Sequence, residues 1–455
     1  MLKLGKGALP MLPDGFTARM RALLKSEYDA FLASFDRPLC TGLRKNPLKP
    51  APACDLSRFS LTPVPWCPTG YFYDAASRPG LSPYHAAGLY YLQEPSAMAP
   101  AELLDVRPGM RVLDLCAAPG GKSTQLAGKL QGRGLLVCNE INPKRAKILS
   151  GNIERLGISN ALVLNEHPAR LAARFAGFFD RILVDAPCSG EGMFRKEAAA
   201  VADWTEDTNA ICAARQQEIL ASAAEMLRPG GRLVYSTCTF SPLENEGVIS
   251  SFLHTHPDFS VAEAPAPYFS PGRPDWIADP APGLDRTFRL WPHKLPGEGH
   301  YAAVLRRGGD APGAALPPEP AAKLPAELAA FCRETNAQLP QGFPVLFGTH
   351  VYIVPDELPQ LKGLRVLRAG LELGEVLKNR FEPAHAWALW LPALERTVSF
   401  PEADPQLARY LAGEVLPGEA RGWTLIQTDG CALGWAKGDG RQLKNHYPKA
   451  LRRPL

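Results

Sequence analysis

The stretch MRVLDLCAAPGGKSTQLAGKL, residues 110–130, decides the fold class of this chain. Its first part, MRVLDLC, is a short apolar run that predicts a buried strand, and KSTQLAGKL at 122–130 predicts a helix. The turn between them is built from small residues, so backbone N–H groups can approach a ligand where the helix begins. This order of elements indicates the ligand-binding edge of an α/β sheet.

The alternation of strand and helix continues towards the C-terminus. Apolar runs and helical spacing predict further strands at 134–140, 160–165, 179–187 and 232–239, and helices at 143–157 and 211–227. Near-continuous apolar strands joined by helices predict a mostly parallel sheet that is covered on both faces. We therefore expect a doubly wound, Rossmann-like α/β domain over residues 96–308.

Other patterns flank this domain, as expected for a chain of 455 residues. Residues 1–95 combine a helical pattern at 15–35, with Asp14 as its N-cap, and short extended segments, which predicts an α+β module. Residues 309–325 form a linker rich in Pro, Ala and Gly. Residues 326–455 predict a β-rich domain. It contains strands with turns at 343–354 and 364–376 and a hairpin at 422–440 that turns at Asp429-Gly430.

Composition excludes several classes of protein. No apolar run approaches the ~18 residues of a membrane helix, and the N-terminus lacks the apolar stretch of a signal peptide. The ten cysteines lie at least 13 residues apart, which excludes CxxC zinc and redox motifs. We expect a cytoplasmic protein with reduced thiols, no metal and no membrane partner.

Charge is concentrated at the two ends of the chain. Residues 1–53 carry a net charge of +5 and residues 441–455 also carry +5, whereas the whole chain carries only +4. Basic ends around a slightly acidic middle favour a polyanion as partner, although basic termini can also serve solubility alone.

Chemically active side chains follow three of the expected strands. Glu140 ends the second strand, where an acidic group can accept both hydroxyls of a ribose. Asp185 and Cys188 end the fourth strand, and Cys238 ends the fifth. Because the carboxyl ends of parallel strands meet at one edge of the sheet, we expect these groups to converge there.

Isolated cysteines are usually buried and inert, and we interpret Cys116, Cys138 and Cys212 in that way. Cys188 and Cys238 differ, because each lies on a loop that leaves a strand and is followed by Ser or Thr. A polar environment of this kind can lower the pKa of a thiol and make it a nucleophile. A redox pair formed by the two thiols is the alternative.

Three motifs occur in the order CAAPGGK at 116–122, PCSG at 187–190 and TCT at 237–239. Together they resemble the motifs of the Sun-type RNA cytosine-5 methyltransferases. QEPSAM at 93–98 and a pattern of Arg44, Asn46 and Lys49 match the same family. Two C-terminal segments, LGWAK at 433–437 and LKNHYPK at 443–449, resemble its bacterial branch that modifies small-subunit (16S) ribosomal RNA, type F. The resemblance covers nearly the whole chain.

The resemblance implies a Rossmann-like core that uses S-adenosylmethionine and a PUA-like C-terminal domain that binds RNA. It also implies that Cys238 attacks carbon 6 of cytosine and that Cys188 assists proton removal and product release. Asp185 is then expected near both cofactor and base. The residues expected to bind the cofactor are Cys116, Ala117, Ala118, Pro119, Gly120, Gly121, Lys122, Glu140, Asn165, His167 and Asp185.

The sequence departs from the family after the third strand, where members usually carry an Asp near the adenine of the cofactor. Here the chain reads Asn165-Glu166-His167. By spacing, His167 takes the place of the Asp, while Asn165 and Glu166 remain alternatives.

The expected partner is RNA, most simply 16S ribosomal RNA or the 30S subunit. The candidate RNA-binding residues are Arg44, Lys49, Arg195, Lys196, Arg441, Lys444, Lys449, Arg452 and Arg453. Transfer RNA or 23S ribosomal RNA remains an alternative substrate, because the catalytic motifs are shared. A non-catalytic RNA-binding assembly factor is the alternative from another class.

Overall fold

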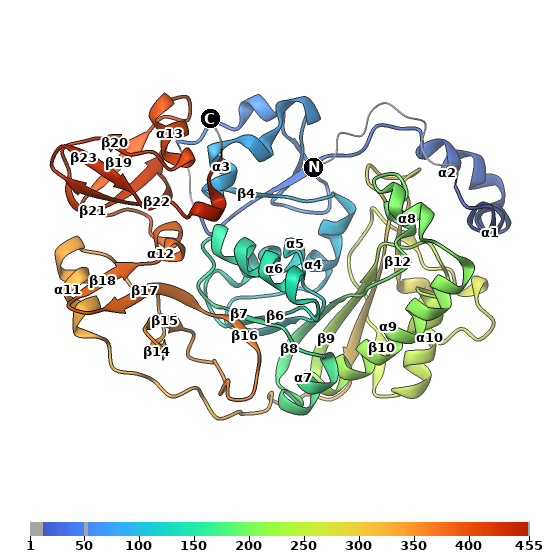
Figure 1. The fold of residues 1–455 in the computed structure, drawn as a ribbon. Helices are drawn as coiled ribbons and strands as arrows, with labels where there is room; N and C mark the ends of the chain where they lie inside the picture. Colours follow the sequence, from blue (N-terminus) through green and yellow to red (C-terminus); the bar gives the residue numbers. More distant parts are fainter. Residues whose placement is uncertain (1–11, 50–52, 454–455) are drawn as a thin grey trace.

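The computed structural model describes residues 12–49 and 53–453. At its centre lies a ten-stranded sheet with the order β11-β12-β13-β9-β8-β5-β6-β7-β16, and β10 pairs with β13 (Figure 1). Five neighbouring strands run parallel and coincide with the five strands expected from the sequence. They are β5 (Arg111–Asp114), β6 (Leu135–Asn139), β7 (Ala161–Leu164), β8 (Phe179–Asp185) and β9 (Leu227–Thr237).

Antiparallel strands extend this sheet at both edges. At one edge β9 is followed by β13 (His300–Arg307), β12 (Phe288–Leu290) and β11 (Ser270–Pro271), with β10 (Phe259–Val261) also on β13. At the other edge β16 (Val366–Ala369) pairs with β7. Strand β16 comes after the expected linker, yet it belongs to the sheet of the Rossmann-like domain. The central sheet therefore includes a strand from beyond the expected domain boundary at residue 308.

Strands with a turn were expected at 364–376, and the structure has two strands there. The segment divides at Gly370 into β16 and β17 (Leu371–Leu377), which belong to different sheets. Gly370 has φ +66°, and a Cβ there would lie 2.3 Å from the carbonyl oxygen of Ile353. Only glycine accommodates this conformation and this close approach, so the chain can change direction here.

Helices cover both faces of the sheet, because successive strand residues point to opposite sides. Val112 and Leu136 pack with one set of helices, and Leu113 and Val137 pack with the other. The first set contains α4 (Ala99–Leu103), α5 (Gly121–Leu130) and α6 (Pro143–Arg155). The second contains α7 (Pro168–Arg174), α9 (Glu206–Met226) and α10 (Glu246–Thr255).

The N-terminal region divides into two parts. The helix expected at 15–35 is interrupted at Lys25–Glu27, so it forms α1 (Asp14–Leu24) and α2 (Tyr28–Ser34), and Pro13 rather than Asp14 is the N-cap. These helices pack beside α8 (Ala198–Ala202) through an aromatic cluster that includes Phe16 and Trp204. A separate small sheet contains β1 (Gly42–Lys45), β2 (Thr62–Pro63), β3 (Gly70–Phe72) and β4 (Tyr90–Leu92). Helix α3 (Pro83–Ala86) precedes β4 in the sequence and contacts it.

The C-terminal region contains two sheets where the sequence indicated one β-rich domain. The first consists of β14 (Phe343–Phe347), β15 (His350–Val354), β17 and β18 (Arg380–Pro383), with α11 (Ala326–Thr335) and α12 (His385–Trp390). The second consists of β19 (Thr397–Phe400), β21 (Arg421–Thr428), β22 (Cys431–Asp439), β23 (Gln442–Asn445) and β20 (Leu416–Pro417), with α13 (Pro405–Ala412). The turn at Asp429-Gly430 is confirmed, since both residues have positive φ, as tight hairpins require.

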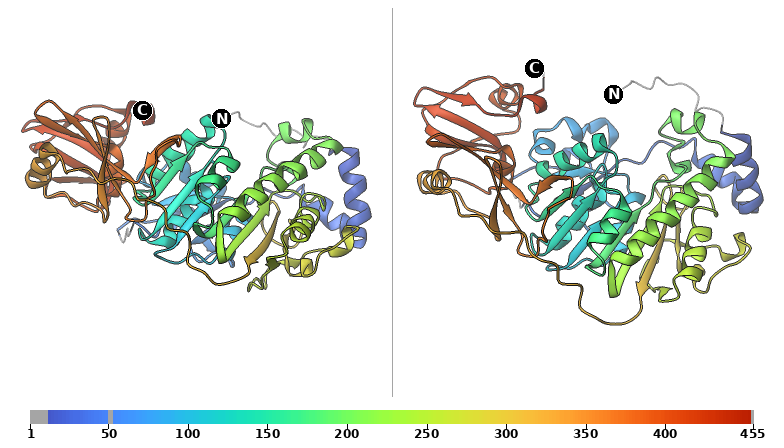
Figure 2. Two further views of the ribbon diagram at one scale, coloured as in Figure 1. Left: turned by 90° about the horizontal axis from the view of Figure 1, so that it is seen from below. Right: turned by 60° about the horizontal axis from the view of Figure 1, so that its bottom comes forward.

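The second C-terminal sheet packs against the small N-terminal sheet. Leu43 and Tyr90 share a buried apolar cluster with Tyr410 and Leu433. Helices α1 and α2 lie at the opposite end of the molecule (Figure 2). Within residues 12–49 and 53–453, no helix is long and apolar enough to cross a membrane.

Candidate active site

A cavity of about 1090 Å³ opens at the carboxyl ends of the parallel strands. Cys116 lies beyond β5, Glu140 beyond β6, and Asp185 and Cys188 beyond β8, and all four line this cavity together with Cys238 beyond β9. The convergence expected from the sequence is therefore confirmed. Strand β5 lies between β8 and β6, and the order of the strands proceeds away from β5 on both sides. A ligand usually binds at such a switch point in doubly wound folds.

A second cavity of about 290 Å³ adjoins the first. The two cavities share five lining residues, which are Cys116, Ala118, Asp185, Met193 and Cys238. Two different ligands could therefore meet beside the Asp185 carboxylate and the Cys238 thiol.

The turn after β5 is held in place by α6. Arg145 donates a 2.6 Å hydrogen bond to the carbonyl of Ala118, and Asn152 donates a 2.8 Å bond to the carbonyl of Pro119. Gly120 has φ +112°, and a Cβ there would lie 3.1 Å from the Leu149 side chain. Among the residues of the expected cofactor turn, Cys116 and Ala118 line the larger cavity, whereas Lys122 lines only the smaller one.

Glu140 is buried and its carboxylate is held at the edge of the larger cavity. Oε1 accepts from the backbone N–H of Asn142 at 2.9 Å, and Arg145 lies 3.5 Å from Oε2. Asn165 donates to the carbonyls of Glu140 and Ile141 at 2.7 and 2.8 Å, so it supports this loop and does not line the cavity. Its position therefore does not favour a direct contact with the cofactor.

The two neighbours of Asn165 have different surroundings. Glu166 is buried, and its carboxylate accepts from the backbone N–H of Arg365 at 2.8 Å. His167 caps α7 and lines the larger cavity. Of the three residues that stand where the family carries an Asp, His167 is thus the one that faces the cavity.

Asp185 forms a buried ion pair with Lys122. The Lys122 Nζ lies 2.8 Å from Oδ2, and the Ser236 hydroxyl donates to Oδ1 at 2.7 Å. Burial alone would raise the pKa of Asp185, but the charges of Lys122 and His300 and these hydrogen bonds outweigh burial and lower the pKa. Burial also opposes the charge on Lys122, and the Asp185 carboxylate outweighs it and raises the pKa of the amine. Both groups therefore remain charged at neutral pH.

The two cysteines singled out by the sequence lie side by side, with Sγ atoms 3.3 Å apart. The hydrogen bond with Cys238 and then burial raise the pKa of the Cys188 thiol well above its usual value. Cys188 therefore keeps its proton at neutral pH. The Cys188 S–H can therefore donate a hydrogen bond to the Cys238 Sγ.

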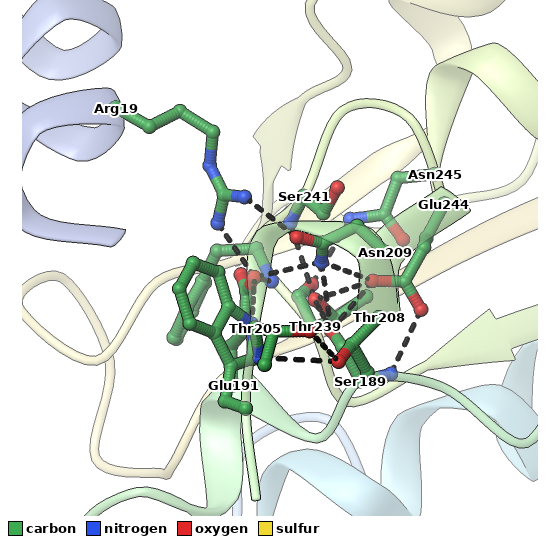
Figure 3. A network of polar contacts seen from close by, with 12 residues as sticks. Arg19, Ser189, Glu191, Thr205, Thr208, Asn209, Thr239, Ser241, Glu244 and Asn245 are labelled. Carbon is green, nitrogen blue, oxygen red and sulfur yellow. Dashed lines mark hydrogen bonds and ion pairs between the residues drawn. The ribbon is translucent and has the colours of Figure 1, made fainter. Parts of the chain in front are cut away.

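A buried carboxylate joins the two loops that carry these cysteines (Figure 3). Glu244, which is 0% exposed, accepts from the backbone N–H and hydroxyl of Ser189 at 2.8 and 2.5 Å and from the Thr239 hydroxyl at 3.2 Å. Ser189 follows Cys188, and Thr239 follows Cys238. Asn209 donates to Glu244 at 2.7 Å and to Glu191 at 2.9 Å. The network therefore fixes the relative position of the two cysteine loops.

This network also reaches the N-terminal helices. Arg19 of α1 donates to Glu191 at 2.6 Å and to Asn209 at 3.0 Å. The sequence analysis did not identify Glu244, Glu191, Asn209 or Arg19. Glu244 follows the TCT motif closely in the sequence, but no spacing rule distinguishes a buried carboxylate of this kind from a solvated one.

Curated relatives match this chain over almost all of its length. The ribosomal RNA small subunit methyltransferase F of Aeromonas hydrophila is 35% identical and is matched over 97% of both chains, and that of Klebsiella pneumoniae is 34% identical over 96% of both. The chain belongs to the RsmB/F family of 16S rRNA methyltransferases. It is accordingly an RNA cytosine-5 methyltransferase that uses S-adenosylmethionine.

Four family models cover successive parts of the chain. The 16S rRNA methyltransferase RsmB/F model matches residues 101–306, and the RsmF N-terminal domain matches 12–95. The RsmF first C-terminal domain matches 330–391 and the RsmF PUA domain matches 398–453, in agreement with the two C-terminal sheets. The PUA-like fold expected for residues 326–455 is confirmed for residues 398–453, whereas residues 330–391 match a separate domain.

Solved structures agree with this assignment. A methyltransferase homolog from Pyrococcus horikoshii is 29% identical and superimposes with a TM-score of 0.57, covering 65% of this chain and 95% of its own. NSun6 from the same organism, solved with SFG, has a TM-score of 0.55 over 67% of this chain and all of its own, but only 22% identity, so it supports the fold alone.

The larger cavity fits the cofactor of the RsmB/F family. It combines a turn of small residues at Cys116 and Ala118 with the buried Glu140 carboxylate, which can accept two ribose hydroxyls. Its volume exceeds the range of about 300–1,000 Å³ that is typical of small-molecule sites. The cavity also extends to Cys188 and Cys238, so a bound methyl donor would reach the two thiols.

Three candidate RNA-binding residues make their contacts within the protein, which does not favour RNA as their partner. Arg44 is 1% exposed and donates to Gln93, the carbonyl of Gly121 and Thr124 at 3.0, 3.0 and 2.7 Å, which ties β1 to the start of α5. Lys49 donates to the carbonyls of Ala87 and Arg155. Arg195 is buried and pairs with Glu298 at 3.1 Å.

The remaining basic candidates stay near the surface or the cavities. Lys196 is half-buried and lines the smaller cavity. Arg441, Lys444 and Lys449 are exposed on the PUA sheet and the segment after it. Arg452 and Arg453 are half-buried, and each donates to a backbone carbonyl, at Tyr447 and Leu81 respectively.

Proposed function

We propose that this enzyme methylates cytosine through a covalent intermediate in which Cys238 is the nucleophile. One observation carries the proposal, namely the pair of Sγ atoms 3.3 Å apart at the junction of the two cavities. Cytosine carbon 5 is a poor nucleophile, and addition of a thiolate to carbon 6 activates it. The smaller cavity would hold the unstacked base, and the larger one would hold the methyl donor.

The reaction balances with the groups that line the two cavities. The Cys238 Sγ forms a bond to carbon 6, and the electron pair of the carbon 5–carbon 6 double bond becomes available at carbon 5. S-adenosylmethionine supplies the methyl group and leaves as S-adenosylhomocysteine. A base then removes the proton from carbon 5, the double bond re-forms, and the bond between Sγ and carbon 6 breaks. Cys188, which keeps its proton, would donate a hydrogen bond to the departing Sγ and so assist release of the product.

Asp185 and Lys122 would bind the ring of the base. Both line the smaller cavity, and both carry charge at neutral pH because each stabilises the charged form of the other. Lys122 was expected to bind the cofactor, but its place in the smaller cavity favours the base as its ligand. A carboxylate and an ammonium group side by side can bind the donor and acceptor groups of one cytosine.

We further infer that the substrate is 16S ribosomal RNA, free or in the 30S subunit, and that the enzyme acts in the cytoplasm. The names of the relatives support this substrate. The PUA domain supports an RNA partner more generally. His167 would then approach the adenine of the cofactor, since it lines the larger cavity near Glu140.

The test is to trap the intermediate. The Cys188→Ala protein is incubated with the cofactor and with bacterial RNA or 30S subunits under reducing conditions, and a denaturing gel reveals any covalent adduct. We expect an adduct that is absent from the Cys188→Ala/Cys238→Ala double variant, and sequencing of the trapped RNA identifies the target base.

A third cysteine provides the control. Cys212 is buried on α9 and lines neither cavity, so Cys212→Ala should leave methyl transfer unchanged and trap no RNA. Normal turnover by Cys238→Ala would contradict the proposal. Absence of any adduct, together with a disulfide between Cys188 and Cys238 after mild oxidation of the wild type, would favour the redox alternative.

A further inference from the structure

The smaller cavity contains a buried histidine that the sequence analysis did not single out. His300 begins β13, is 8% exposed, and lines the cavity together with Asp185 and Cys238. Its Nδ1 lies 2.9 Å from the carbonyl oxygen of Gly299. Because a carbonyl can only accept, Nδ1 carries the proton, and Nε2 is left with an acceptor lone pair.

Nε2 of His300 has no hydrogen-bond partner among the described residues, although it is buried. It lies 3.9 Å from Oδ1 of Asp185. An unpaired buried polar atom costs roughly 1–3 kcal/mol, so its presence beside the two thiols indicates that a ligand completes the site. Burial and then the charge of Lys122 lower the pKa of His300 to about 4, so the imidazole is neutral at pH 7 and remains an acceptor.

Two other carboxylates of this cavity interact with N–H groups or with a cation of the protein, whereas Asp114 Oδ1 lacks a hydrogen-bond partner among the described residues. Glu94 accepts from the backbone N–H groups of Ser96 and Ala97 at 3.0 and 2.9 Å. Glu298 forms its ion pair with Arg195. Asp185 Oδ1, which also accepts from the Ser236 hydroxyl, and His300 Nε2 lie next to each other in this cavity, so one ligand could contact both acceptors.

We propose that Asp185 and His300 together accept the two N–H groups of the exocyclic amine of cytosine, and that His300 thereby selects cytosine over uracil. Two acceptors 3.9 Å apart can both be reached by one nitrogen, since an N–H···acceptor bond spans about 2.9 Å. Uracil carries a carbonyl oxygen in place of the amine. This oxygen has no proton to donate, so it could not form a hydrogen bond with either acceptor. This assignment rests on the proposed covalent function and identifies how that site reads its base.

The test compares three bases in one RNA. The target cytosine is first identified from RNA methylated by the wild type, and short RNAs are then made with cytosine, uracil or pyrimidin-2-one at that position. Pyrimidin-2-one has neither the amine nor the carbonyl at carbon 4. The measurement is the rate of covalent adduct formation at low RNA concentration, in the Cys188→Ala background.

We expect His300→Phe to slow adduct formation with cytosine RNA by about 10–100-fold, the effect of one lost hydrogen bond to a buried group. Its effect on pyrimidin-2-one RNA should be less than about threefold, because that base has no amine to lose. His300→Gln should recover much of the rate with cytosine, since its side-chain oxygen can accept in place of Nε2. The preference for cytosine over uracil should fall in His300→Phe and not in His300→Gln.

A matched histidine separates specificity from stability. The side chain of His293 is 4% exposed, against 7% for His300, but its Nε2 pairs with Glu27 and it lines neither cavity. His293→Phe should therefore leave the ratio between the bases unchanged. Equal losses with cytosine and pyrimidin-2-one in His300→Phe, or no loss with cytosine, would overturn the assignment. Failure of the wild type to methylate cytosine would instead overturn the proposed function.

Discussion

Single buried ionisable residues set the conditions under which this site holds together. Asp114 ends β5 directly before the cofactor turn and is almost completely buried. The Ser123 hydroxyl donates to its Oδ2 at 2.6 Å, while Oδ1 has no partner among the described residues. Burial raises the pKa of Asp114 to about 7, against the opposing effect of the Ser123 hydrogen bond.

This shift predicts that Asp114 makes the folded protein less stable as pH rises. The unfolded carboxyl loses its proton near pH 4, whereas the folded one keeps it up to about pH 7. The associated stability is therefore fully present below pH 4 and is lost as pH rises through 7. For a shift of this size the loss is about 4 kcal/mol.

Asp114→Asn removes the titration while keeping an oxygen that can accept from Ser123. We expect the Tm of this variant to fall less than that of the wild type between pH 5 and pH 8, as measured by thermal denaturation. Asp310→Asn, which alters an exposed carboxylate in the linker, is the control and should follow the wild type. Parallel Tm curves for Asp114→Asn and the wild type would show that Asp114 is already ionised in the folded protein.

At the scale of elements, the site depends on two loops that are far apart in sequence. The loops after β8 and β9 carry Cys188 and Cys238, and Glu244 accepts hydrogen bonds from both loops. Glu244→Gln puts an amide N–H₂ where an acceptor is required, so at least one of these bonds is lost. A lost bond of this kind costs roughly 1–3 kcal/mol and allows the two loops to separate.

We therefore expect Glu244→Gln to lower kcat by about 10–100-fold while the Kd for S-adenosylmethionine stays unchanged. The rate at which oxidised glutathione links Cys188 to Cys238 reports the distance between the thiols, and it should fall as well. Glu225→Gln alters an exposed residue of α9 and should change neither quantity. A normal disulfide rate with a reduced kcat would mean that Glu244 acts on the chemistry rather than on the loops.

The elements that the sequence predicted well are those with a local signal. Strands β5 to β9 are apolar runs, and the turn at Asp429-Gly430 requires two residues with positive φ, so both were predicted at their observed places. Strand β16 has no such signal, because its partner is Leu164 in β7, about two hundred residues earlier. Its place depends on long-range pairing that periodicity does not encode.

The same distinction holds within the site. Convergence of Asp185, Cys188 and Cys238 follows from the rule that parallel strands end at one edge of the sheet. The role of Arg44 does not follow from any pattern, since a basic residue near the N-terminus resembles an RNA contact until its acceptors on Gln93 and α5 are known. His300 was missed for a similar reason, because its importance lies in an unpaired atom.

At the scale of the whole molecule, folding brings the C-terminal PUA domain against the segment that contains Leu81 and Tyr84. Tyr84 donates to Asp429 at 2.7 Å, and Arg453 donates to the carbonyl of Leu81 at 2.7 Å. The C-terminal basic segment is also part of the PUA sheet, because β23 lies between β22 and β20. Deleting the chain after Asp439 would therefore remove an inner strand and could not report on RNA binding alone.

Substitution of the exposed basic residues is the sharper test of RNA binding. We expect the triple variant Arg441→Ala/Lys444→Ala/Lys449→Ala to fold normally and to bind RNA more weakly. If each residue neutralises one phosphate of single-stranded RNA, the slope of log K against log salt should decrease by about 2. Filter binding at several salt concentrations measures this slope.

The control must remove the same charge from elsewhere. Lys323, Lys362 and Lys378 are exposed on the linker and beside the first C-terminal sheet, so their replacement by Ala changes the net charge equally. If only local phosphate contacts matter, this control keeps the wild-type slope. Equal slopes for both triple variants would mean that the PUA sheet does not bind the backbone of RNA. Lys196 and the smaller cavity would then provide the main contacts with RNA, and RNA affinity would depend mainly on binding of the unstacked base.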